Sequence, residues 1–101
     1  MAEKVYSIKE IKEKIKTQES FFEQKYHVNK FLLFGSYAKG EQTSDSDIDL
    51  LVEFKETIDM FEMIDLQNYL TDLFGKKVDL GTPKGLKSFI KNKILNEAIV
   101  L

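Results

Sequence analysis

The chain has 101 residues, of which 43% are hydrophobic and 32% charged, with no cysteine and a formal net charge of −2. This composition predicts one globular domain over residues 1–101, and it excludes disulfides, thiolate nucleophiles and cysteine zinc sites. The slight acidity argues against direct binding of nucleic acid. Because no long apolar run or leader-like start is present, we expect a cytoplasmic protein without a membrane segment.

The first predicted element is a helix from about Ser7 to Lys25. Ser7 followed by Glu10 has the spacing of a capping box, which marks a helix start. The apolar residues behind it fall near helical spacing: Ile8, Ile11, Ile15 and Phe22. We therefore expect this helix to bury one face.

Two predicted strands enclose a glycine-containing turn. Residues 30–34, "KFLLF", form an apolar run typical of a buried strand, and "DIDLLVEF", residues 47–54, alternates as a second strand. Between them, "GSYAKG" predicts a turn with one helical turn, and "EQTSDSD" predicts a loop.

A second long helix is predicted from Asp59, which with Glu62 can cap it, to Gly75, which can end it. Its apolar stripe comprises Met63, Leu66, Leu70, Leu73 and Phe74. Residues 77–81, "KVDLG", predict a third strand. A last helix follows Pro83, with the apolar residues Leu86, Phe89, Ile90 and Ile94, and the tail "AIVL" either continues it or forms a short strand. The order αβ(α)βαβα predicts an α/β (α+β) fold, in which a sheet packs against helices.

Acidic residues at alternate positions of the second strand are the main functional feature. Asp47 and Asp49 share one strand face, ~6.6 Å apart along the strand. Their carboxylates can converge on a hard cation such as Mg²⁺ or Mn²⁺. An ordinary solvated loop explains "SDSD" about equally well, but it explains Asp49 less well because Asp49 lies within an apolar run.

Two other motifs fit less well. The acids Asp45, Asp47, Asp49 and Glu56 match four positions of an EF-hand loop, but Leu50 stands where its sharp turn needs glycine. Gly35 and Gly40 have the spacing of a Walker A loop, but the Lys-Ser/Thr pair that should follow is absent. We therefore expect neither an EF-hand nor a P-loop.

The glycine turn itself fits phosphate binding. Gly35 lets the backbone approach an anion closely, and a helical turn that opens at Ser36 points N–H groups toward it. The Ser36 hydroxyl adds a donor, and Lys39 adds a positive charge one turn later. An ordinary strand-to-helix turn explains Gly35, but not its combination with the acids that follow.

The stretch "GSYAKGEQTSDSDIDLLV" resembles the G-S…D-x-D signature of the DNA polymerase beta-like nucleotidyltransferases. Its form G-S-x-A-x-G…S-D-x-D-L, in a short chain, is similar to the minimal nucleotidyltransferase (MNT) family. The resemblance implies a small mixed sheet and a carboxylate triad on adjacent strands. Asp47 and Asp49 match its first two acids and Asp79 its third, while Gly35, Ser36, Lys39 and Ser46 match the nucleotide-binding part. Without the resemblance, Asp79 reads as an ordinary edge-strand acid.

The resemblance also implies the chemistry. Two metal ions, Mg²⁺ or Mn²⁺, would lie ~3.5–4 Å apart at the acids, and a nucleoside triphosphate, for which we expect ATP, would supply the nucleotidyl group. Asp79 would be a metal ligand and a candidate base toward the acceptor. Lys39 and Tyr37 stand where arginine is frequent in the family, and lysine lacks the bidentate fork of arginine, so weaker triphosphate binding is expected.

Larger members of the superfamily carry a second domain that holds the acceptor, which predicts that a partner supplies it here. MNT proteins commonly pair with a helical HEPN protein, a ribonuclease toxin for which the MNT protein is the antitoxin, and some attach AMP to it. We therefore expect a nucleotidyltransferase antitoxin in a hetero-oligomer. Two alternatives remain: a protein that neutralises its partner by contact alone, and a transferase that acts on a small molecule.

Overall fold

A computed structural model describes residues 5–43, 45–83, 92–93 and 96–101. Its sheet has the order β3-β2-β1-β4, with β1 at Val28–Phe34, β2 at Ile48–Phe54, β3 at Val78–Gly81 and β4 at Ile99–Val100. β1 runs antiparallel to both β2 and β4, whereas β2 and β3 are parallel. The predicted mixed sheet and its three strands are thus confirmed, and the tail forms a strand.

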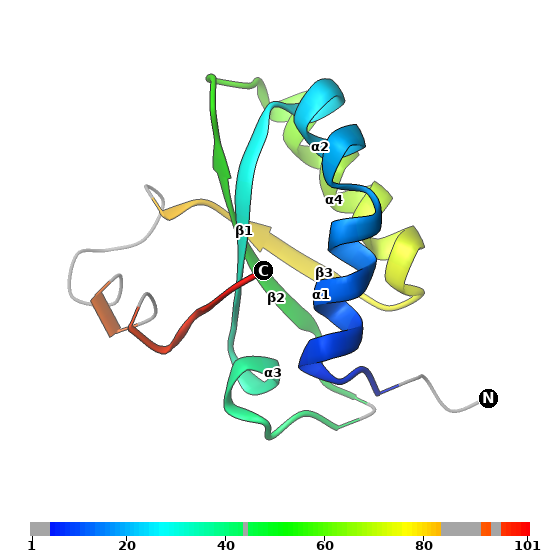
Figure 1. Cartoon of the computed structure of the whole chain (residues 1–101), viewed down its shortest axis with the longest axis vertical. Helices are drawn as coiled ribbons and strands as arrows, with labels where there is room; N and C mark the ends of the chain where they lie inside the picture. The colour runs from blue at the N-terminus through cyan, green and yellow to red at the C-terminus, as the bar shows by residue number, and fades with distance from the viewer. Residues whose placement is uncertain (1–4, 44, 84–91, 94–95) are drawn as a thin grey trace.

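Three helices cover one face of the sheet: α1 at Ile8–Thr17, α2 at Glu19–Tyr26 and α4 at Met60–Phe74 (Figure 1). The predicted caps are confirmed. The Ser7 and Glu10 side chains form the capping box, the Asp59 carboxylate accepts from the N–H of Glu62, and Gly75 ends α4 with a φ of 64°. Among the helices that the structure describes, none is both long and apolar enough to cross a membrane.

The continuous helix predicted from Ser7 to Lys25 is wrong, because it breaks at Gln18. Gln18 has φ −120° and ψ 17°, and its side chain accepts a hydrogen bond from the Tyr69 hydroxyl of α4. Just after the break, the Phe22 ring packs edge-on against both Phe31 of β1 and Tyr69. The bend therefore lets α2 pack against the sheet and α4 at once.

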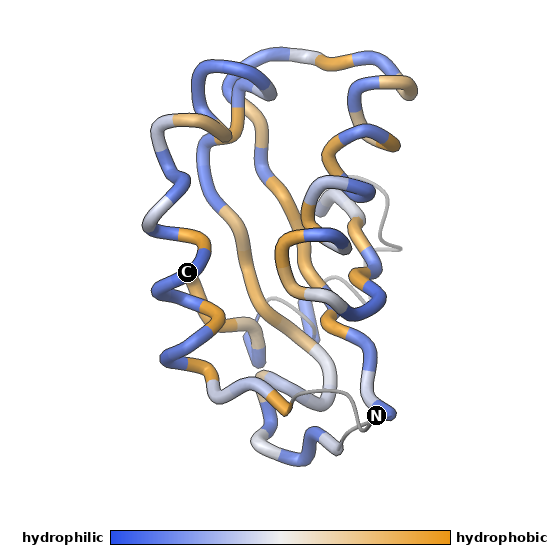
Figure 2. Tube along the Cα trace, turned by 90° about the vertical axis from the view of Figure 1, so that its right-hand side faces the viewer, coloured by the Kyte–Doolittle hydropathy of each residue, from blue (hydrophilic) through white to orange (hydrophobic). Residues whose placement is uncertain are grey.

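The core lies between these helices and the sheet. Hydrophobic residues run along the long central strands, whereas hydrophobic and hydrophilic residues alternate along the helices (Figure 2). On β2, Ile48, Leu50 and Val52 join this core, as predicted. Leu51 is buried as well, but it lies outside this cluster, which fits the alternation of strand faces. The last helix predicted after Pro83 lies outside the described residues.

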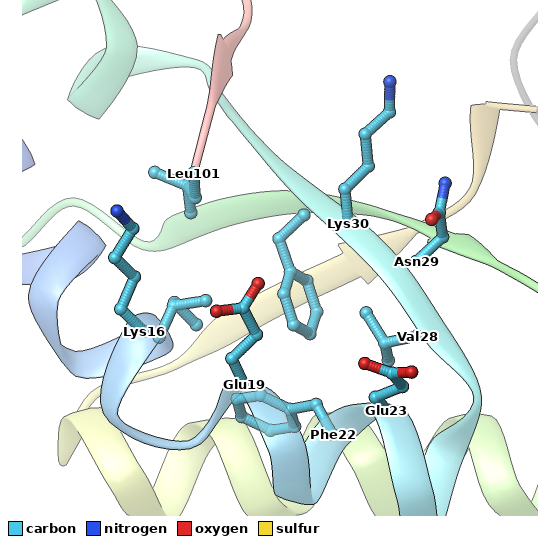
Figure 3. A pocket seen from close by; sticks show the side chains of 10 residues that line it. Lys16, Glu19, Phe22, Glu23, Val28, Asn29, Lys30 and Leu101 are labelled. Atoms are coloured by element: carbon cyan, nitrogen blue, oxygen red, sulfur yellow. The ribbon is translucent and has the colours of Figure 1, made fainter.

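The C-terminal tail is fixed to β1. The Leu101 N–H donates to the carbonyl of Phe31 at 3.0 Å, and Ile99 and Leu101 pack against the core. Leu101 also borders a hollow of about 70 Å³ between the α1–α2 junction and β1, with Lys16 and Glu19 at its rim (Figure 3). None of the predicted site residues lines this hollow.

Candidate active site

Strand register brings the predicted acids together. β2 and β3 are parallel, and Asp49 pairs directly with Asp79. Asp47 lies two residues earlier, where the N–H of Ile48 donates to the Lys77 carbonyl at 3.0 Å. Asp49 and Asp79 therefore lie on two adjacent strands, and Asp47 directly precedes β2, which begins one residue later than predicted.

The glycine turn adjoins the same acids. Phe34, the last residue of β1, pairs with Asp49, so Gly35 begins the turn beside that carboxylate. Gly35 has φ 75° and ψ −152°, a conformation that is essentially restricted to glycine. A Cβ atom at Gly35 would overlap Oδ2 of Asp49 and lie 3.2 Å from its Cγ. The one-turn helix α3, Ser36–Lys39, follows as predicted.

Burial and neighbouring charges act on Asp49. Burial, followed by the negative charges of Asp79 and Asp47 and a hydrogen bond with Asp79, raises the pKa of its carboxyl to about 6. The positive charge of Lys77 opposes them. Like charges held close together favour protons or a cation between them, as expected for a cation site.

Lys77 is a site residue that the sequence analysis missed. Its Nζ lies 3.8 Å from Oδ2 of Asp47 and 3.8 Å from Oδ1 of Asp79, so one ammonium contacts two of the three acids. The signal was present in the sequence: Lys77 stands two residues before Asp79, so it shares the strand face of that acid.

The acids fit a divalent cation in their chemistry, since carboxylate oxygens are the ligands that Mg²⁺ and Mn²⁺ prefer. However, across the residues that the structure describes, no three His, Cys, Asp or Glu side chains are arranged to hold a metal ion as they stand. Asp47 and Asp79 face Lys77 instead. A metal would therefore have to rearrange side chains that are about half exposed.

Two of the residues predicted to bind phosphate, Lys39 and Ser46, contact other groups of the protein. Ser36 is the first residue of α3, as predicted. The Lys39 Nζ lies 3.6 Å from Oε2 of Glu97, so this lysine is paired with a carboxylate. The Ser46 hydroxyl oxygen accepts from the Thr43 N–H at 2.9 Å, which closes the loop before β2. The nucleotide-binding roles of Gly35, Ser36, Lys39 and Ser46 remain predictions.

A buried lysine lies beneath the site. Lys76 is 4% exposed, and its Nζ donates to the Ser46 carbonyl at 2.7 Å. The same Nζ lies 5.8 Å from the centre of the Tyr37 ring, which is fully buried. Lys76 thus links the start of β3 to the loop before Asp47 and to α3. The sequence analysis did not single it out.

The family model for polymerase beta nucleotidyltransferases matches residues 9–101. A candidate protein adenylyltransferase of Methanocaldococcus jannaschii, MJ0128, is 44% identical over 93 residues, which are 92% of this chain and 91% of that protein. The protein adenylyltransferase MntA of Thermococcus cleftensis is 34% identical over 93 residues, 92% of this chain and 94% of that protein.

Solved structures agree with these relatives. A structure described as a minimal nucleotidyltransferase is similar with a TM-score of 0.80 and 30% identity, covering 95% of this chain and 97% of that one. A tri-AMPylated HEPN toxin of Shewanella oneidensis in complex with its MNT antitoxin matches with a TM-score of 0.63 and 18% identity, over 88% of this chain and 69% of that one. At 18% identity, the second likeness shows a shared fold and no more.

Proposed function

The chain belongs to the polymerase beta nucleotidyltransferase family, and on this premise we propose that it transfers AMP from ATP to a hydroxyl group of a partner protein. Asp47, Asp49 and Asp79 are proposed to hold Mg²⁺ or Mn²⁺. The observation that carries the proposal is the pairing of Asp49 with Asp79 beside the Gly35 turn. It brings hard oxygen ligands and a candidate phosphate-binding turn to one end of the sheet.

The reaction requires one bond to form as another breaks. The acceptor oxygen attacks the α-phosphorus in line, the α–β phosphoanhydride bond breaks, and pyrophosphate leaves. Asp79 is proposed to take the proton of the attacking hydroxyl. A divalent ion at the acids would supply neutralisation of the developing charge. The Ser36 hydroxyl donates a hydrogen bond to the triphosphate. Lys39 leaves Glu97 and pairs with the triphosphate instead. Positioning and neutralisation of charge then account for most of the rate.

The proposed partner is a HEPN-type toxin. Support comes from the relatives named as protein adenylyltransferases and from the likeness to an MNT antitoxin that is bound to a HEPN toxin. An exposed apolar patch on α4 fits such a contact: Met60 is 76% exposed, Phe61 83% and Ile64 52%. Large exposed apolar side chains that lie together indicate an interaction surface.

The C-terminal tail contributes little to this surface. Val100 is 55% exposed, whereas Ile99 and Leu101 pack against the core. We therefore place the contact on α4. Met60 and Met63 also line a groove of about 1020 Å³, together with Phe54 and Pro83. A helical partner would bury the three exposed side chains and adapt to this groove.

The test is transfer of label from ATP carrying an α-phosphate label, with the neighbouring gene product as acceptor. We expect label on a hydroxyl of the partner, located by mass spectrometry, and none with the Asp47→Ala, Asp49→Ala variant. If that variant still protects cells from the partner without an adduct, the protein neutralises by contact. Label found on an added small molecule alone would favour a transferase that acts on a small molecule.

A further inference from the structure

The backbone of Lys77 is fixed by strand pairing, whereas its side chain is exposed. Its carbonyl accepts from the N–H of Ile48 at 3.0 Å, within the pairing of β2 and β3. Its side chain is 66% exposed, with Nζ 3.8 Å from both Asp47 and Asp79. The ammonium can therefore leave the acids without any change in the sheet.

The ammonium has the charge that the acids require. Three carboxylates on neighbouring strand positions repel one another, and a cation between two of them offsets part of that repulsion. Two exposed ion pairs stabilise the fold only slightly, so the ammonium is readily displaced. It lies against two of the three side chains proposed to bind the metal, so ammonium and metal compete for the same oxygens.

The outcome of this competition depends on the net charge of the ligand that approaches the acids. A bare divalent ion is repelled by the ammonium and must displace it. A divalent ion complexed with a triphosphate carries net negative charge, so the displaced ammonium is attracted to the incoming complex. The same side chain then opposes one ligand and assists the other.

We propose that Lys77 is a tethered counter-ion, which occupies the acids in the metal-free protein and selects a metal–nucleotide complex over the bare metal ion. The inference rests on the proposed function, because it assumes that Asp47, Asp49 and Asp79 bind the metal. It assigns Lys77 a positioning and selectivity role, distinct from that of the acids.

The test compares binding of Mn²⁺ alone with binding of Mn²⁺ complexed with a non-hydrolysable ATP analogue, by calorimetry at low salt. In Lys77→Met, we expect Mn²⁺ alone to bind roughly three- to tenfold more tightly, because one repelling charge is removed. The nucleotide complex should not gain in parallel, so the ratio of the two affinities falls. Lys77→Arg keeps the charge and should keep the parental ratio.

Lys30→Met is the matched control for the loss of a charge. Lys30 pairs with one carboxylate, Glu53, at 3.6 Å, and its side chain is also partly exposed. In Lys30→Met, the ratio of the affinities for Mn²⁺ alone and for the nucleotide complex should equal that of the parent. Thermal unfolding without metal checks that each variant folds.

Three results would overturn the inference. Mn²⁺ affinity in Lys77→Met that equals or falls below the parental value removes the competition. An equal gain for the ion and the nucleotide complex removes the selectivity. In both cases, normal binding by the parent leaves the proposed function standing. If the parent binds neither probe, the metal site of the proposed function is wrong as well.

Discussion

Gly35 and Asp49 occupy adjoining space: a Cβ atom on Gly35 would overlap the Asp49 carboxylate oxygen Oδ2. The glycine was expected to let the backbone approach the phosphate of a nucleotide. In the structure, the anion that lies against it is the second acid of the triad. The turn proposed to bind phosphate and the acid proposed to bind metal are thus in direct contact, so a change in one must move the other.

Gly35→Ala should therefore cost more stability than a glycine substitution that introduces strain alone. Gly40→Ala is the control, since Gly40 has φ 72° but no atom of the described residues lies within 4 Å of an added Cβ. We expect a loss of about 1 kcal/mol for Gly40→Ala and about 2–4 kcal/mol for Gly35→Ala, measured by urea unfolding. Equal losses would show that the Asp49 carboxylate moves aside at no cost.

Nucleotide binding should also depend on the close approach of Gly35 to the Asp49 carboxylate. Gly35→Val should remove binding of the ATP analogue, because it displaces Asp49 and crowds the turn. Ser36→Ala removes only a donor to a charged group, and we expect it to weaken binding by about 1.5–3 kcal/mol. Calorimetry of both variants with the metal-bound analogue tests this. Parental affinity in Gly35→Val would exclude the turn from the binding site.

Asp49 should make the metal-free fold less stable as pH rises. Its pKa is about 6 in the folded protein against a usual 3.8, so the folded state binds this proton more tightly than the unfolded chain. Below about pH 4 both states are protonated and the difference vanishes; it grows as pH rises and is complete above about pH 6. With allowance for screening by water, the free energy of unfolding falls by about 1–2 kcal/mol over this range.

Asp49→Asn isolates this effect. The difference in free energy of unfolding between Asp49→Asn and the parent should increase in favour of the variant from pH 4 to pH 7, measured in the presence of a chelator. Acids away from the site titrate alike in both proteins and cancel in the difference. Asp47 and Asp79 lose a neighbouring negative charge in the variant, which changes the difference in the same direction. A constant difference over this range would show that Asp49 titrates normally.

Local patterns predicted much of this fold. Caps and apolar spacing identified α4 almost to the residue, and alternation placed Asp47 and Asp49 on the strand face away from the core. The break at Gln18 carries no glycine or proline, and it depends on packing against Tyr69, which the local sequence does not reveal. Long-range packing of this kind is where single-sequence reasoning fails.

The site was predicted in part. The role of Asp79 came from the family resemblance, because the pairing of Asp79 with Asp49 depends on a parallel crossover through α4 that spacing alone does not fix. Once β3 was assigned, alternation could also have identified Lys77. Lys76 could not have been found in this way, because a buried lysine has no distinctive local pattern.

Asp79→Asn should separate catalysis from binding. Asparagine keeps the shape of the side chain but cannot take a proton, so we expect transfer to be abolished while analogue binding weakens much less. An effect confined to the transition state lowers turnover more than ground-state affinity. Single-turnover transfer and calorimetry on the same preparation test this. Equal losses in both would make Asp79 a metal ligand without a role as base.

The neighbouring lysines 76 and 77 should differ in their contribution to stability, although each substitution by methionine removes one positive charge. Lys76 is 4% exposed and donates to the Ser46 carbonyl at 2.7 Å. Methionine at position 76 leaves that carbonyl without this donor, and we expect a loss of about 1–3 kcal/mol. The pairs of Lys77 are exposed, so Lys77→Met should cost less than about 1 kcal/mol.

Urea unfolding of the two variants without metal gives the comparison. Lys76→Met should also loosen the loop before Asp47, because Ser46 directly precedes that acid, and hydrogen exchange at residues 45–47 should then be faster than in Lys77→Met. If the two variants are equally stable, with equal exchange in this loop, the hydrogen bond from Lys76 does not hold the loop. The position of Asp47 would then depend on strand pairing, through the bond between Ile48 and Lys77.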